Sequence, residues 1–124
     1  MKYPGLWGRS ILVVENELLI AMDIAGALEK AGAHATMTTT VRHALILVEH
    51  DGLSGAIMDH ALSDGESTAL CARLKERGIP YLSYSGYSAV RGADPAALHI
   101  MKPVSMDTLM SALEELLPST TRIS

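Results

Sequence analysis

Several short apolar runs in this sequence end at a polar side chain that could take part in chemistry. These residues are Glu15, Asn16, Asp59, Ser85 and Lys102. Carboxylates favour a hard cation, a lysine helps the cation to neutralise an anionic group, and an aspartate can act as a nucleophile. The combination predicts phosphoryl transfer to Asp59, a reaction in which the protein mainly positions the reacting groups and neutralises charge.

Five predicted strands position these residues. The first, Ile11–Val14, is an unbroken apolar run rich in β-branched side chains, which is typical of a strand covered on both faces. Four further segments predict the remaining strands: His34–Thr40, Ala56–Met58, Pro80–Ser85 and His99–Met101.

Apolar residues at helical spacing predict helices between the strands. Ser88–Leu98 contains Gly92 and Pro95, so any helix there should be short or broken. The predicted apolar faces are Leu18, Met22, Ala25 and Leu28 in the first helix; Val41, Ala44, Leu45 and Val48 in the second; Ala69, Leu70 and Leu74 in the third; and Leu109, Met110, Leu113, Leu116 and Leu117 in the last.

This alternation of strands and helices predicts an α/β fold with a doubly wound parallel sheet. Right-handed crossovers place helices on both faces of such a sheet. Ligands of these folds bind beyond the carboxyl ends of the strands. The polar residues at the strand ends should therefore converge on one edge of the sheet.

The composition limits the class of protein. The 124 residues are enough for one domain, and 48% hydrophobic residues exclude a disordered chain. A net charge of −4 without a basic run argues against nucleic acid as the main partner. The single cysteine excludes an internal disulfide and suits a reducing cytoplasm, and no apolar run near the start is long enough for a membrane span or a signal peptide.

Four segments resemble the receiver domain of two-component response regulators, namely Ile11–Glu17, Ala56–Asp59, Tyr84–Tyr87 and Met101–Pro103. The resemblance spans residues 10–117 and implies a flavodoxin-like, five-stranded sheet with strand order 2-1-3-4-5. Residues 1–9 are then an N-terminal extension and residues 118–124 a C-terminal tail, which leaves no room for an output module in this chain.

The resemblance also implies a role for each residue of the predicted site. Asp59 is the phosphoacceptor, Ser85 contacts the phosphoryl group and reports its presence, and Lys102 pairs with the phosphoryl oxygens. Glu15 and Asp59 help to hold Mg²⁺, together with the backbone carbonyl of Ala61. Phosphorylation in this family is self-catalysed, but the domain is a regulator and not an enzyme.

Two positions depart from the family pattern. Asn16 replaces an acid that usually ligates Mg²⁺, and its amide lowers the charge of the ligand set, so we expect Mg²⁺ to bind weakly. His99 replaces an aromatic switch residue. It either makes the same inward movement with added pH sensitivity or takes no part, and the sequence leaves both alternatives open.

Each residue taken alone also has a purely structural interpretation. Asp59 could form a turn or cap a helix, and Glu15 and Glu17 could complement the positive end of the first helix. Ser85 could be a turn hydroxyl, and Lys102 could be a solvated residue at a strand end. Their occurrence at successive strand ends favours the functional interpretation.

Two functions follow from these observations. The first is a single-domain bacterial response regulator that takes a phosphoryl group from a histidine kinase or phosphotransfer protein and signals to another protein. The second is a degenerate receiver that binds a protein without phosphorylation. A hydrolase is disfavoured because Ala61 offers no general acid. Pro80–Tyr87 partly matches a motif of a subgroup of single-domain receivers found mainly in alphaproteobacteria. The sequence also leaves a homodimer open.

Overall fold

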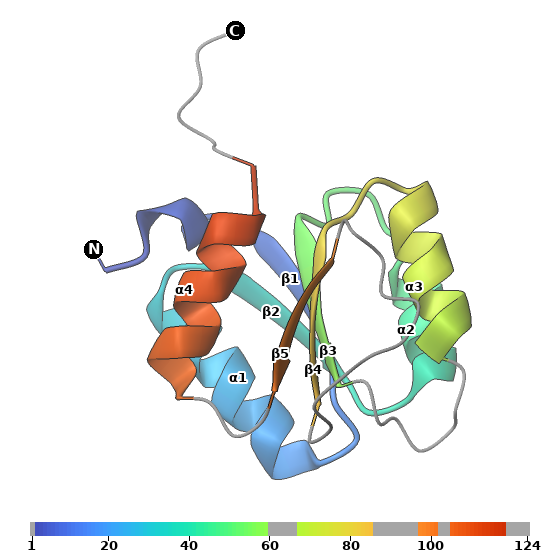
Figure 1. Cartoon of the computed structure of the whole chain (residues 1–124), viewed down its shortest axis with the longest axis horizontal. Coiled ribbons are helices and arrows are strands. Elements are labelled where there is room, and N and C mark those ends of the chain that lie inside the picture. Colours follow the sequence, from blue (N-terminus) through green and yellow to red (C-terminus); the bar gives the residue numbers. More distant parts are fainter. Residues whose placement is uncertain (1, 60–66, 86–96, 102–104, 119–124) are drawn as a thin grey trace, which may run out of the picture.

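The computed structural model describes residues 2–59, 67–85, 97–101 and 105–118. Strands and helices alternate along most of the chain (Figure 1). The elements are η1 (Pro4–Leu6), β1 (Ser10–Val14), α1 (Leu18–Lys30), β2 (His34–Thr38), α2 (Val41–Leu47), β3 (Gly55–Asp59), α3 (Ser67–Glu76), β4 (Tyr81–Ser85), β5 (Ala97–Met101) and α4 (Met106–Leu116).

The strands form one parallel sheet in the order β2-β1-β3-β4-β5. The predicted doubly wound sheet and its strand order are confirmed. β1 and β3 lie in the interior of the sheet and are buried almost throughout, which explains their unbroken apolar sequences. β2 lies at an edge, and three of its five residues are exposed.

The helices cover both faces of the sheet, as predicted. α1 and α4 lie on one face and α2 and α3 on the other (Figure 1). Alternate strand residues point to opposite faces, so Val13, Ile57 and Leu82 join the core beneath α1 and α4. Their neighbours Leu12 and Ala56 join the second core with α2 and α3.

The inward face of α1 differs from the prediction. Ala21, Ile24 and Leu28 are fully buried, whereas Leu18 and Met22 are 56% and 50% exposed. Apolar residues occur nearly all around this helix, so periodicity alone could not select the buried face. Ala21 is small and lies towards the sheet, where close packing favours it over a longer side chain.

Local sequence signals mark several helix ends. Thr40 caps α2 by accepting a hydrogen bond from the His43 backbone, and Ser105 caps α4 by accepting one from Thr108. Gly32 follows α1 with a φ of +87°, a conformation that glycine adopts without strain. α1 therefore ends just before Gly32.

The segment before β1 is not a detached extension. Leu6 in η1 is fully buried in the core beneath α1 and α4. The Gly5 backbone donates to Glu114 of α4 at 2.7 Å, and Arg9 donates to the carbonyl of Pro118. The prediction missed this packing because the segment has no periodicity and because Glu114 and Pro118 are more than 100 residues away from their partners in it.

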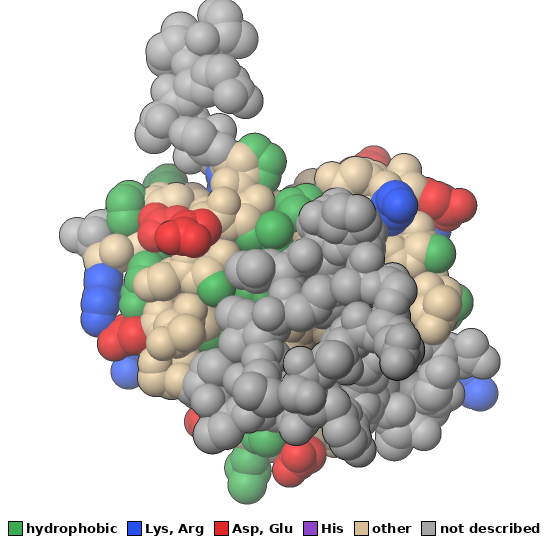
Figure 2. Space-filling model, in the orientation of Figure 1, with side chains coloured by type: hydrophobic (Ala, Val, Ile, Leu, Met, Phe, Trp, Pro, Cys, Tyr) green, Lys and Arg blue, Asp and Glu red, His purple; other side chains and the backbone are tan. Residues whose placement is uncertain are grey.

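The described surface carries charges of both signs. Figure 2 shows acidic and basic side chains interspersed on the coloured part of the face that contains α1 and α4. Arg73 of α3 pairs with Glu49 at 2.5 Å, and Arg77, which directly follows α3, pairs with Asp51 at 3.2 Å. No helix among the described residues is long and apolar enough to cross a bilayer.

Candidate functional site

Two of the predicted carboxylates lie together at the carboxyl ends of adjacent strands. Asp59 is the last residue of β3, and Glu15 directly follows β1. Val14 and Met58 are register partners, so the residues that follow them stand side by side. Glu15 is fully buried and Asp59 is 3% exposed. Both carboxylates therefore depend on protein groups for the hydrogen bonds that water would otherwise supply.

Protein donors hold both oxygens of Glu15. The hydroxyl of Tyr84 donates to Oε1, and the backbone N–H of Glu17 donates to Oε2 at 2.9 Å. Glu17 is the N-cap residue of α1, so the bond also ties Glu15 to the start of that helix. The bonds fix the position of the carboxylate without a cation.

Asn16 lies between the two acids. With its amide in the orientation that satisfies its neighbours, the side-chain nitrogen lies 3.0 Å from Glu15 Oε2 and 3.3 Å from Asp59 Oδ2. The amide then donates to both carboxylates. An aspartate at this position would add a third negative charge, whereas the asparagine bridges the two acids as a neutral donor.

The donor set is suited to a hard divalent cation, with reduced charge. Glu15 and Asp59 offer carboxylate oxygens, and Asn16 offers an amide oxygen once its side chain rotates. Among the described residues, no group of three or more histidine, cysteine or acidic side chains could hold a metal ion. The two carboxylates and one amide agree with the reduced ligand charge expected from the sequence.

Tyr84 belongs to the site although the sequence did not predict it. Its side chain is 4% exposed and it is the register partner of Asp59. Burial is the largest reason why the pKa of the Tyr84 phenol lies above its ordinary value, and the hydrogen bond to Glu15 comes next. The phenol therefore stays a neutral donor. A buried tyrosine needs a partner for its hydroxyl, which was the available signal.

The remaining predicted residues are described only in part. Ser85 ends β4 and is the register partner of Met101, which precedes Lys102, while His99 is the register partner of Ser83. The backbone of Ser85 thus reaches the same edge of the sheet as Asp59. Lys102 and Ala61 lie outside the described residues, and so does most of Ser88–Leu98.

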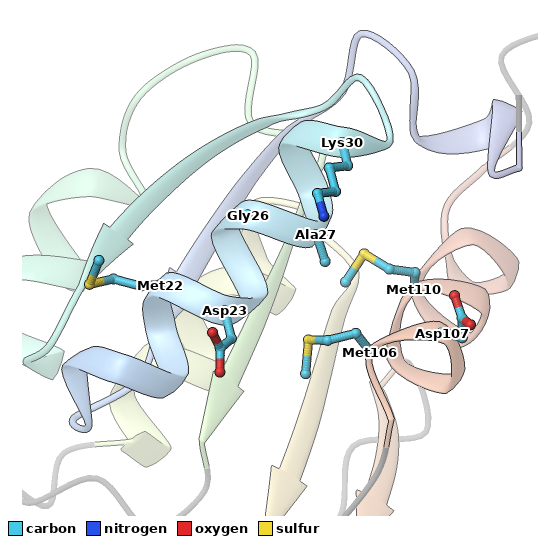
Figure 3. A pocket seen from close by; sticks show the side chains of 8 residues that line it. All are labelled: Met22, Asp23, Gly26, Ala27, Lys30, Met106, Asp107 and Met110. Carbon is cyan, nitrogen blue, oxygen red and sulfur yellow. The ribbon is translucent and has the colours of Figure 1, made fainter.

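A groove of about 430 Å³ lies elsewhere, between α1 and α4 (Figure 3). None of the predicted site residues lines it. Lys30 and Asp23 of α1 and Asp107 of α4 add charges to its wall. The side chains of Met106 and Met110 point from α4 towards α1 and line the groove with apolar surface (Figure 3).

Comparisons with known proteins match the fold closely. The chain is 36% identical to SdrG from Sphingomonas melonis Fr1, over 90% of this chain and 97% of that one, with a TM-score of 0.74. It is 28% identical to a CheY-like response regulator receiver domain protein from Methanospirillum hungatei JF-1, over 87% and 92% of the two chains, with a TM-score of 0.76.

A third solved structure contains ligands. The chain is 22% identical to a response regulator from Burkholderia pseudomallei that carries a phosphorylated aspartic acid, a calcium ion and citrate, over 85% of this chain and 66% of that one, with a TM-score of 0.73. No protein-family profile matches the sequence, and no curated protein is significantly similar to it.

Proposed function

Because this chain belongs to the receiver-domain family of response regulators, we propose that it accepts a phosphoryl group on Asp59 and signals through a protein partner. The observation that carries the proposal is the position of Asp59, which is buried at the carboxyl end of β3 beside Glu15 and Asn16. A similar fold carries a phosphorylated aspartic acid in the Burkholderia pseudomallei protein.

The proposed donor is a phosphohistidine of a histidine kinase or phosphotransfer protein. One oxygen of Asp59 attacks the phosphorus, the phosphorus–nitrogen bond breaks, and the released imidazole takes up a proton. Ser85 and Lys102 are proposed to bind the phosphoryl oxygens, which spread negative charge during transfer. The reaction is self-catalysed in the sense that this chain supplies the catalytic side chains itself and needs only the donor and a cation.

Mg²⁺ is the proposed cation, held by Glu15, Asn16, Asp59 and the backbone carbonyl of Ala61. When bound, it would neutralise charge on the acids and on the incoming phosphoryl group. Asn16 has to turn its amide oxygen inward, which breaks its two hydrogen bonds to the carboxylates. Weak binding is therefore expected for two reasons, the lower ligand charge and the loss of those bonds.

Asn16→Asp tests this view of the cation site. The substitution adds a carboxylate to the ligand set, so we expect Mg²⁺ to bind about tenfold more tightly, as measured by calorimetry. Asp23→Asn changes an exposed acid of α1 and serves as a control that should leave the affinity unchanged. Equal Mg²⁺ affinity in Asn16→Asp and the wild type would refute the assignment of Asn16 as a ligand.

The phosphoacceptor is tested with acetyl phosphate or beryllofluoride in the presence of Mg²⁺. We expect a mass increase or amide shifts centred on β3 and β4 in the wild type and in Asp23→Asn, and none in Asp59→Asn. An adduct that persists in Asp59→Asn would place the site elsewhere. A wild type that does not respond would favour the second function, a phosphorylation-independent binding module.

Several finer points belong to the same proposal. The protein would act in the cytoplasm beside its phosphodonor, and His99 would either follow the state of Ser85 or stay outside the switch. Membership of the subgroup with the fourth-strand motif, the domain boundaries and a homodimer stay predictions.

A further inference from the structure

Tyr84 reaches across the strand that carries the phosphoacceptor. The sheet order places β3 between β1 and β4, so the hydrogen bond from Tyr84 to Glu15 joins side chains of the two strands that flank Asp59. Neighbouring strands are about 4.8 Å apart. The side chains of Tyr84 and Glu15 therefore reach together across two such spacings to form the bond.

The strand pattern puts all three side chains on one face of the sheet. Ile57 and Leu82, two residues before Asp59 and Tyr84, belong to the core beneath α1 and α4. Val13, two residues before Glu15, belongs to the same core. The phenol of Tyr84 thus lies on the side of Asp59 from which Glu15 would share a cation with it.

The hydrogen bonds of Glu15 differ in how easily they can be given up. Asn16 is exposed, so water can partly replace the hydrogen bond that its amide loses when it turns away from Glu15. The Glu17 N–H is a backbone group, and it donates to Glu15 Oε2 only. Tyr84 is buried, and its hydroxyl uses Oε1. Of these two side-chain donors, Tyr84 is therefore the one whose release costs more.

We propose that Tyr84 is a positioning residue that holds Glu15 in a closed arrangement, and that Glu15 can ligate a divalent cation only after the Tyr84–Glu15 hydrogen bond breaks. The inference rests on the proposed cation site. It adds a further cause of weak Mg²⁺ binding to the two that arise from Asn16. In the closed arrangement, Tyr84 and Asn16 donate hydrogen bonds to Glu15. A bound cation would replace these bonds with coordination to the carboxylate.

Tyr84→Phe tests the inference because it removes the hydroxyl and keeps the ring. Mg²⁺ is titrated by calorimetry and by amide NMR at neutral pH without any phosphodonor. We expect binding about tenfold tighter than in the wild type, the size of one hydrogen bond to a charged group. Unchanged or weaker binding overturns the inference, because Oε1 would then accept the phenol and the cation together. The absence of saturable Mg²⁺ binding in both proteins overturns it as well.

Tyr81→Phe is the matched control. Tyr81 lies on the same strand and is also buried, but it belongs to the core beneath α2 and α3. We expect its Mg²⁺ affinity to equal that of the wild type. If Tyr81→Phe tightens binding as much as Tyr84→Phe does, the effect is one of general loosening and the inference is wrong.

A measurement on the wild type does not depend on how the variants fold. Breaking the Tyr84–Glu15 bond changes the environment of a buried phenol, so Mg²⁺ should produce a tyrosine difference absorption spectrum. A titration that saturates without such a signal contradicts the inference.

Beryllofluoride separates this inference from the proposed function. If Tyr84→Phe binds Mg²⁺ like the wild type while both form the Asp59 adduct, the inference fails and the proposed function stands. If Tyr84→Phe binds Mg²⁺ more tightly but neither protein forms the adduct, phosphoacceptance fails and the role of Tyr84 stands.

Discussion

The same pair of groups, a tyrosine hydroxyl and a carboxylate, occurs in two very different parts of this molecule. Tyr3 donates to Asp107 at 2.6 Å at the surface, where the Asp107 side chain is 69% exposed and also pairs with Lys2. Tyr84 donates to Glu15 at the carboxyl ends of the strands, where Glu15 is fully buried. Only the surroundings differ in kind.

The pKa values of the two tyrosines are raised for different reasons. The hydrogen bond to Asp107 is the main cause that raises the pKa of Tyr3, whereas burial is the main cause for Tyr84. Water can replace Tyr3 as a partner of Asp107, but no solvent is at hand to replace Tyr84 at Glu15. The difference teaches that a tyrosine–carboxylate pair stabilises a fold mainly where its loss would strand a buried charge.

Removing the whole buried side chain should have the largest effect. Tyr84→Ala leaves a cavity in the core beneath α1 and α4 and takes the donor from Glu15, so we expect the free energy of unfolding to fall by about 4 kcal/mol. Urea unfolding followed by circular dichroism measures it. A loss below about 1 kcal/mol would show that the phenol is not packed as described.

Removing only the buried hydroxyl should have an intermediate effect. Tyr84→Phe keeps the ring and leaves Glu15 Oε1 without this donor, so we expect a loss of about 2 kcal/mol in the absence of divalent cations. The same urea experiment tests it, with Tyr81→Phe as the control in the other core. A Tyr84→Phe protein as stable as the wild type would mean that repulsion between Glu15 and Asp59 outweighs the hydrogen bond.

Alkaline pH should separate the two tyrosines next. The folded-state pKa of Tyr84 is raised, so its stabilisation is complete below about pH 10 and is lost as the pH rises above that value. Between pH 10 and 11 wild-type stability should fall by up to about 1.4 kcal/mol more than that of Tyr84→Phe. Urea midpoints at pH 8, 10 and 11 test this. Equal losses of stability in the wild type and in Tyr84→Phe would contradict the cause assigned to the raised pKa of Tyr84.

The surface pair should show the smallest effect. Tyr3→Phe removes a hydrogen bond that water replaces, and Lys2 stays paired with Asp107 at 2.9 Å. We expect the urea midpoint, the alkaline loss of stability and the Mg²⁺ affinity to equal those of the wild type within error. A Tyr3→Phe protein as unstable as Tyr84→Phe would abolish the distinction between the two pairs.

The sequence predicted those parts of the fold and site that depend on local patterns. Unbroken apolar runs mark the buried strands, and a parallel sheet brings their carboxyl ends together, so Glu15 and Asp59 could be expected to meet. Asn16 was recognised as the departure in the ligand set. Its role as a donor between two acids required their actual positions.

The features that were missed depend on distant parts of the chain. Tyr84 and Glu15 are separated by 69 residues, and nothing near either residue in the sequence indicates the other. The buried face of α1 was misplaced because packing against the sheet, and not hydropathy, chose Ala21 over Leu18 and Met22. Residues 1–9 were read as an extension because they show no periodicity and because partners such as Glu114 of α4 are distant in the sequence.

The contacts between the first residues and α4 also impose an order on folding. Tyr3 and Asp107 are 104 residues apart, and Gly5 and Glu114 are 109 apart. Contacts of such high sequence separation need a long loop to close before they form, so we expect them to form late in folding. During synthesis Leu6 would leave the ribosome well before α4, which flanks its place in the core. The apolar side chain of Leu6 therefore stays without its packing against α4 until that helix has been synthesised.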